Sequence, residues 1–387
     1  MLTLKYMRKI KYLFLLFLLA APVCAQEEHN LGFMDFGAHI QAGAYPNSHG
    51  ARGAEGNGDI GFMTNPDFNV NQAWVWLGRE ADASTDAFDF GFRLDAFYGT
   101  DAFLQAAINS NYMRPDGSVK KYWDSNFMRG GRMTPGVYGF AVPQTYAEIA
   151  YYKWKLSAGR LYFPLGYENA DATLNYFYSK TFYTMSLPPT VTGALLAKSF
   201  GPLDLTAGAY YGLGTGFYNP YRDYFFSGAA VYNFGKNAAL TYYIVGGRYG
   251  NNINGGARIF APAGAFVYYH NLLFEFTPKK YLHLATEIYY NHDNLRGMPA
   301  NNLYGVTQYA VYDINKQFSA GLRAEYMAYY RPQNDNRYSA TANITYKPVK
   351  WFYARPEVRY SWGNAYAYNG GKDAAQLNGG MEFTAIF

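Results

Sequence analysis

The stretch FDFGFRLDAFY, from Phe88 to Tyr98, separates its side chains into two sets by simple alternation. One set contains Phe88, Phe90, Phe92, Leu94, Ala96 and Tyr98, and the other set carries Asp89, Arg93 and Asp95. Successive side chains of a β-strand point to opposite faces of the sheet, so this period of two predicts a strand with one apolar and one charged face. The apolar face would form the core of a soluble sandwich, but in a membrane barrel it would face lipid and the charges would point inward.

The first 25 residues bear on this choice because they have the pattern of a secretory signal peptide. A basic start is followed by an apolar run from Leu13 to Val23 and by the small residue Ala25, after which we expect cleavage. Lipid attachment at Cys24 is the rival reading, but Val23 is not the small residue that such processing usually requires. Since Cys24 is the only cysteine, the mature chain has no disulfide, and its stability comes from burial and backbone pairing.

The composition narrows the class of partner and the way the chain can cross a membrane. The signal peptide carries 4 of the 33 basic residues and no acid, which leaves 29 basic against 28 acidic residues in the mature chain. Such a balance gives no indication of a nucleic-acid partner. The chain has 41 Tyr and 29 Phe, yet after the signal it has no unbroken apolar run of the ~20 residues that a spanning helix needs. If the mature chain lies in a membrane, we expect a barrel.

Three further stretches repeat the alternation of the opening one: 318–326, 338–347 and 352–361. In each of them one face collects the charges, which are Arg323, Glu325, Lys347, Arg355, Glu357 and Arg359. The apolar faces begin and end with aromatic residues, namely Phe88 and Tyr98, Phe318 and Tyr326, Tyr338 and Tyr346, and Phe352 and Tyr360. Aromatic girdles at both membrane interfaces are typical of outer-membrane barrels, whereas a sandwich core gives no reason for this spacing.

The remaining chain extends the pattern and ends on a comparable strand. Met381, Phe383, Ala385 and Phe387 share one face of the last segment, and this ending is typical of the strand that outer-membrane assembly machinery recognises. Tight turns rich in Gly, Pro, Asn and Lys separate many of the strands. The predicted strands are 33–45, 69–79, 86–98, 144–152, 156–163, 192–200, 204–212, 224–233, 238–247, 266–277, 281–291, 303–313, 317–328, 337–347, 351–361 and 377–387.

These observations predict an all-β fold, a transmembrane antiparallel up-and-down β-barrel of about 16 strands in the bacterial outer membrane. Fourteen or eighteen strands also fit, because 69–79 and 144–152 alternate poorly. Residues 26–387 are expected to form this single domain. Arg93 or Arg359 turned to the bilayer midplane would cost about 2 to 4 kcal/mol each, so the charged face must line a watery interior.

Two segments carry a resemblance to a known family. FGFRLDAFYGTDA (90–102) and the stretch from Tyr146 to Phe200 resemble the OmpL-like β-barrel porins of the porin-2 type. The resemblance is strongest over roughly 69–212, and it implies an outer-membrane channel with no catalytic residues to transfer. It also marks the YGTD turn (98–101) and the GYEN segment (166–169) as characteristic.

The functional residues of a channel lie at its narrowest points. The segment from Pro164 to Val191 is long, aromatic and without clear alternation, so it is expected either to fold partly into the lumen as a constriction or to pack over the rim as an external loop. Region 101–143 is a basic lid or a solvated loop. The pore-lining or constriction candidates are Asp89, Arg93, Asp95, Asp101, Arg160, Glu168, Asp171, Lys180, Arg323, Glu325, Arg355, Glu357 and Arg359.

Other predicted inward charges on the wall are Lys347, Glu148, Glu275, Glu287 and Glu382. Without the four loop candidates Asp101, Glu168, Asp171 and Lys180, the wall has six basic and eight acidic side chains. This balance does not predict ion selectivity, because selectivity depends on the charges at the constriction. The six histidines show no metal-ligand spacing and no nucleophile elbow is present. We therefore expect no enzyme, no metal and no cofactor.

The sequence favours a water-filled channel for passive diffusion of small hydrophilic solutes or ions. The alternative is a substrate-specific channel or surface receptor whose aromatic-rich loops stack on solutes such as saccharides. An outer-membrane lipid enzyme would need a Ser/His pair at the lipid-facing wall that the sequence does not reveal. Expected partners are outer-membrane lipid and the assembly machinery, with a homotrimer as one oligomeric form.

Overall fold

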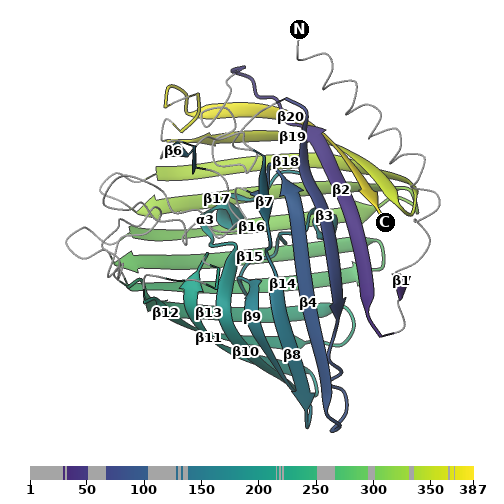
Figure 1. The fold of residues 1–387 in the computed structure, drawn as a ribbon. Coiled ribbons are helices and arrows are strands. Elements are labelled where there is room, and N and C mark those ends of the chain that lie inside the picture. Colours follow the sequence, from purple (N-terminus) through teal and green to yellow (C-terminus); the bar gives the residue numbers. More distant parts are fainter. Residues whose placement is uncertain are drawn as a thin grey trace.

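The chain folds into a closed barrel of antiparallel strands (Figure 1). The computed structural model describes residues 29–30, 33–50, 67–102, 128–129, 132–133, 138–214, 216–217, 219, 222–250, 266–294, 301–330, 335–364, 367–369 and 371–387. The predicted signal peptide, 1–25, lies outside these residues, as does most of 101–143. The main sheet has 18 strands, but β1 (His29–Asn30) and β7 (Gly139–Ala141) are only two and three residues long. The other sixteen confirm the predicted count.

Each predicted segment contains one barrel strand, with bounds shifted by up to three residues, as at the start of β4. The barrel strands are β2 (Asp35–Ala44), β3 (Asn69–Arg79), β4 (Asp89–Gly99), β8 (Thr145–Tyr151), β9 (Trp154–Tyr162), β10 (Thr190–Phe200), β11 (Leu203–Leu213), β12 (Tyr224–Asn233), β13 (Ala238–Arg248), β14 (Phe266–Lys279), β15 (Leu282–Asn294), β16 (Asn301–Asp313), β17 (Phe318–Tyr330), β18 (Asp335–Val349), β19 (Phe352–Gly363) and β20 (Ala375–Ile386). A short hairpin, β5 (Met128–Arg129) with β6 (Arg132–Met133), lies outside the main sheet.

Closure comes from the first and last barrel strands. β2 pairs with β3 on one side and with β20 on the other, in a register that places His39 opposite Ile386. The terminal residue takes part, because Phe387 N donates to Ala38 O over 2.7 Å and Ala38 N donates to Phe387 O over 3.1 Å. A closed ring leaves no unpaired strand edge, which a sheet in hydrocarbon cannot tolerate.

Short turns join the strands at one end of the barrel, called here the turn end, and long connections join them at the other, the loop end. Only Tyr152 and Lys153 connect β8 to β9, and both adopt positive φ, 49° and 61°, as a two-residue hairpin turn requires. Gly201, with φ 64°, serves the turn between β10 and β11. In outer-membrane barrels the turn end faces the periplasm.

Apolar and charged side chains lie on opposite faces of the strands, as the alternation predicts. Leu322 on β17 is 63 % exposed on the outside, whereas the next residue, Arg323, is 2 % exposed and points inward. The aromatic residues at the strand ends, such as Phe88 and Tyr98, are exposed on the outer face. The prediction that Lys347 is one of the inward charges of the wall is corrected. Lys347 lies exposed near the turn end of β18 and not within the buried part of the wall. No helix in the described part of the chain is long and apolar enough to cross a membrane.

Candidate functional site

The segment between β9 and β10, residues 163–189, lies inside the barrel and is called here the inserted segment. It contains a short 3-10 helix, η4 (Ala172–Leu174), and a short α-helix, α3 (Phe182–Ser186). Figure 1 shows α3 within the ring of strands. The side chains of Asp171 and Thr181 cap the two helices by accepting bonds from Thr173 N and Thr184 N. The segment therefore adopts the inward arrangement and not the external one over the rim.

Arg323 on β17 is the main basic anchor of the inserted segment. Its Nη1 donates to Glu168 Oε1 over 2.7 Å and to the carbonyl oxygen of Ser179 over 2.8 Å, and its Nη2 donates to Ser179 Oγ over 2.8 Å. The ring of Phe177 packs against the guanidinium, 4.7 Å from Cζ to the ring centroid. The fixed fork of arginine donors suits this multiple contact.

Glu325 on β17 and Arg359 on β19 extend the same network. Arg359 Nη2 lies 3.1 Å from Glu325 Oε1, and Arg359 Nη1 donates to the carbonyl of Lys180 over 2.8 Å. Glu325 Oε2 in turn accepts the backbone N–H of Phe182 over 2.7 Å, at the start of α3. Buried charges are tolerated only where they are paired and hydrogen-bonded, and here the partners are supplied by the inserted segment.

Glu357 on β19 binds the main chain of residues 178–179, which precede α3. Its carboxylate accepts the backbone N–H of Tyr178 over 2.8 Å and that of Ser179 over 3.0 Å. Tyr45, just beyond β2, donates its hydroxyl to the same carboxylate over 2.7 Å. Glu357 thus binds both the main chain of the inserted segment and Tyr45, which follows the first barrel strand and so lies beyond the junction of β20 with β2.

A second group of candidates lies where the inserted segment meets β3. Gln72 Nε2 donates to Asp101 Oδ2 and to the carbonyl of Ala170, both over 2.9 Å, and Lys180 Nζ donates to the carbonyl of Asn169 over 2.8 Å. Burial raises the pKa of the Asp101 carboxyl from 3.8 to about 6, with Lys180 and Gln72 acting in the opposite direction. Burial also lowers the pKa of Lys180.

Asp89, Arg93, Asp95, Arg160 and Arg355 form contacts within the wall. Arg93 pairs with Asp95 within β4, and Asp89 pairs with Arg79 near the turn end over 2.8 Å. Arg160 donates to the carbonyl of Val142 over 2.8 Å and to Thr190. Arg355 on β19 pairs with Glu382 on β20 over 2.9 Å. These contacts stabilise the wall itself.

Two cavities adjoin the inserted segment and share Tyr167 and Glu168 as lining residues. The first, of about 150 Å³, is lined near the loop end by residues that include Tyr162, Asn169 and Lys180. The second, of about 230 Å³, is lined by residues that include Glu275 on β14 and Tyr309 on β16. Tyr167 and Glu168 belong to the GYEN segment, so the stretch singled out by the resemblance divides the space inside the barrel.

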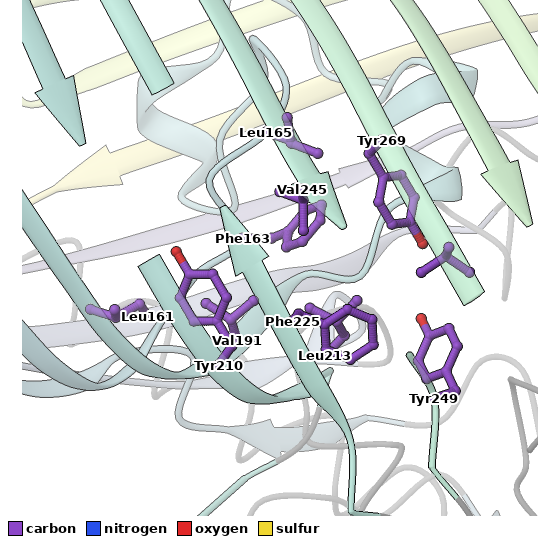
Figure 2. Packing of buried hydrophobic residues seen from close by; sticks show 11 residues of the cluster. Leu161, Phe163, Leu165, Val191, Tyr210, Leu213, Phe225, Val245, Tyr249 and Tyr269 are labelled. Carbon is purple, nitrogen blue, oxygen red and sulfur yellow. The ribbon is translucent and has the colours of Figure 1, made fainter. Parts of the chain in front are cut away.

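An apolar cluster fills part of the interior, which alternation alone does not predict. Figure 2 shows side chains from β9 to β14 packed against the start of the inserted segment. Val191, Leu213, Phe225 and Val245 are all fully buried there, facing inward. The inward face is therefore partly hydrophobic in this sector, because the inserted segment supplies Phe163 and Leu165 as apolar partners.

Several contact residues were absent from the sequence candidates. Gln72, Tyr45, Tyr178 and Ser179 hold or form the inserted segment but carry no charge. The one available signal was the poor alternation of 69–79, where the polar residues Asn71 and Gln72 are adjacent. Asn71 accepts the Tyr178 hydroxyl over 2.8 Å. Among the described residues no group of three or more His, Cys, Asp or Glu side chains is placed to hold a metal ion.

Solved structures with the same fold are outer-membrane proteins of low sequence identity. OmpT of Vibrio cholerae has a TM-score of 0.58 at 12 % identity, with 93 % of this chain and 100 % of that chain covered. The outer-membrane channel DcaP of Acinetobacter baumannii has a TM-score of 0.58 at 11 % identity, with 92 % and 99 % covered. An anion-selective porin from Comamonas acidovorans has a TM-score of 0.56 at 8 % identity, again with 92 % and 99 % covered.

No curated protein matches the chain by sequence. The family model described as "Putative beta-barrel porin-2, OmpL-like" matches residues 32–387, which is nearly the whole chain and includes every strand of the closed barrel. The chain therefore belongs to the OmpL-like β-barrel porin-2 family of the outer membrane.

Proposed function

We propose that this protein is an outer-membrane channel through which small hydrophilic solutes or ions diffuse passively, with the inserted segment as its constriction. The observation that carries the proposal is the attachment of residues 163–189 to inward charges of the wall by Arg323, Glu325, Glu357 and Arg359. A segment held by so many buried polar contacts narrows the lumen in a fixed place. The charges that line the remaining space then determine which solutes pass.

The pore-lining roles follow from this arrangement. Glu168 and Lys180 line a cavity directly, whereas Arg323, Glu325, Glu357 and Arg359 position the segment that forms the constriction. Asp89, Arg93, Asp95, Arg160 and Arg355 are assigned to the wall. Asp101 and Asp171 hold the segment against β3 and β2, with Asp171 Oδ1 lying 3.7 Å from His39 Nδ1.

Removal of the inserted segment tests this function directly. Thr190 is paired with Tyr162 in the β9–β10 ladder, so residues 163–189 can be replaced by Asn-Gly, which forms a two-residue hairpin turn. Purified protein should produce step-like conductance in planar bilayers, and the shortened variant should produce larger steps. The change in migration on heating in detergent gels serves as the control for a folded barrel. No steps from the folded wild-type protein under any salt or voltage would refute the channel.

A substrate-specific channel or receptor is the second candidate. It is favoured by the aromatic lining of the two cavities, which includes Tyr162, Tyr167, Tyr176 and Tyr309, because aromatic faces suit sugar rings. Saturable block of the conductance by one class of saccharide, lost in the shortened variant, would support it. Concentration-independent conductance in the presence of saccharides would leave simple diffusion as the function.

Three further assignments accompany the channel. The signal peptide directs export and is removed by cleavage after Ala25, and the mass of the protein purified from outer membranes tests this cleavage. The assembly machinery recognises β20 and Phe387, so removal of Phe387 should lower the amount of folded protein in the membrane. A homotrimer is the proposed assembly, because OmpT of similar fold occurs in a trimer form, and the mass in mild detergent tests it.

A further inference from the structure

The inward face of β14 to β16 is acidic. Glu275 on β14 lines the second cavity, and Glu287 on β15 is fully buried at mid-strand. Asp313, at the turn end of β16, adds a third carboxylate, 3.2 Å from the ring of His283. Glu168 of the inserted segment also lines this cavity. Acidic side chains thus follow one sector of the lumen from its middle to the turn end.

Basic side chains are absent from the inward face of the same sector in the part of the wall that the structure describes. Strands β10 to β16 contain three Lys or Arg residues, and all of them lie at or near strand ends. Lys198 stacks on the exposed ring of Trp154, 4.6 Å from its centroid, while Arg248 and Lys279 are the last residues of β13 and β14. The inward arginines lie on other strands, in ion pairs or bound to carbonyl oxygens.

Four buried oxygens in this acidic sector form no hydrogen bond with the residues that the structure describes: Glu287 Oε2, Asn271 Oδ1, Thr307 Oγ1 and Tyr309 OH. Glu287 stands directly opposite Thr307 in the strand register, a relation that places Cβ atoms about 4.5 to 5.5 Å apart. The other carboxylate oxygen, Oε1, accepts Asn271 Nδ2 over 2.8 Å and the backbone N–H of Tyr167 over 3.0 Å. Unsatisfied buried oxygens beside a carboxylate are rare in folded proteins and need a compensating positive group or water.

From these observations we propose that the β14–β16 sector is a path for monovalent cations, and that Glu275 and Glu287 make the channel cation-selective. The inference rests on the proposed channel function. A desolvated cation in this sector is coordinated by carboxylate, amide and hydroxyl oxygens, whereas an anion is repelled by the carboxylates and meets no inward Lys or Arg along β10 to β16. Monovalent ions fit because the described residues offer no cluster of carboxylates that would hold a divalent ion tightly.

The reversal potential of the purified full-length protein in planar bilayers under a KCl gradient tests this path. The wild-type protein should show the sign for K⁺ over Cl⁻. Glu287→Gln and Glu275→Gln should each shift the reversal potential toward zero, and Glu275→Lys should shift it further than Glu275→Gln. Glu80→Gln is the matched control, because Glu80 is 78 % exposed in the turn after β3, where it pairs with Lys155, and is far in sequence and sheet order from β14 to β16.

The outcomes separate this inference from the channel itself. A reversal potential of zero or of the anion sign overturns the cation path while leaving the channel in place. Shifts in the Gln variants no larger than that of Glu80→Gln overturn the roles of Glu275 and Glu287. Complete absence of conductance instead refutes the proposed function. Glu287 is fully buried, so the partly exposed Glu275 carries the test if Glu287→Gln fails to assemble.

Discussion

Arg323 on β17 donates a hydrogen bond from Nη1 to Oε1 of Glu168 over 2.7 Å, with both side chains almost fully buried. The contact joins the barrel wall to the inserted segment across 155 positions of sequence. Neither charge meets bulk water, so each depends on the other and on the neighbouring polar groups. The position of the inserted segment is therefore fixed by a wall residue and not by the segment alone.

Replacing Arg323 by Met should loosen the inserted segment and destabilise the barrel. The change leaves Glu168 and Glu325 without their shared cation, and removing one partner of a buried pair typically costs about 3 to 5 kcal/mol. Denaturant unfolding in detergent micelles should show this loss, and conductance steps should become larger or noisier. Glu80→Gln is the control, since Glu80 is 78 % exposed where it pairs with Lys155 and surface pairs contribute about 0 to 1 kcal/mol. Equal losses in the two variants would contradict the anchoring role.

The stability of the protein should fall as the pH rises from about 4 to about 6 because of Asp101. Its pKa is raised from 3.8 to about 6, so in this window the folded protein keeps a proton that the unfolded chain has lost. One pKa unit corresponds to about 1.4 kcal/mol, which gives an effect of roughly 3 kcal/mol that is complete above pH 6. Asp101→Asn should remove this dependence, as measured by denaturant midpoints at several pH values.

Asp82→Asn provides a control of opposite sign for the titration of Asp101. Asp82 lies exposed in the turn after β3, and hydrogen bonds from Ser84 lower the pKa of its carboxyl. A lowered pKa stabilises the folded state above the ordinary value and this contribution is lost as the pH falls. Asp82→Asn should therefore leave the loss of stability between pH 4 and pH 6 in place. If Asp101→Asn also leaves it in place, Asp101 is not its source.

The adjacent glycines of β20 should respond differently to alanine. A Cβ at Gly380 would lie 2.2 Å from Cδ2 of Tyr45, whose hydroxyl bonds Glu357, whereas a Cβ at Gly379 meets nothing within 4 Å. Overpacking of this kind costs typically about 1 to 3 kcal/mol. Gly380→Ala should lower the free energy of unfolding and Gly379→Ala should not. Equal effects would mean that Tyr45 does not occupy the space beside Gly380.

A charge on the outer face should disrupt assembly according to its depth. Leu322 lies at mid-strand on the outside of β17, and Arg there should cost about 2 to 4 kcal/mol by exposing a cation to hydrocarbon. Phe318, at the turn end of the same strand and face, should tolerate Arg with a cost of about 0 to 1 kcal/mol. The amount of heat-modifiable protein in outer membranes measures both. An unaffected Leu322→Arg variant would contradict the lipid-facing assignment.

The strands were predictable because their signal is local. The alternation of 86–98 and the aromatic residues at its ends reflect the environment on each side of one strand, and the closed sheet follows once every strand has a lipid face. The inward direction of Arg323, Glu325, Glu357 and Arg359 was predictable for the same reason. Lys347 was misplaced because its position near the turn end lets it reach solvent.

What the sequence alone determined is the barrel, its strand count and the face on which most charges lie. These could be predicted because the alternation of apolar and polar side chains along a strand involves only neighbouring residues. Only the tertiary structure decided which charges meet and what fills the lumen. The partners of Arg323 and Glu357 come from the inserted segment, far along the chain, and the cluster around Val191 and Val245 becomes buried only because Phe163 and Leu165 pack against it. Contacts across a closed ring depend on the strand register and on the fold of the segment inside the ring. Neither of these produces a periodic pattern in the sequence.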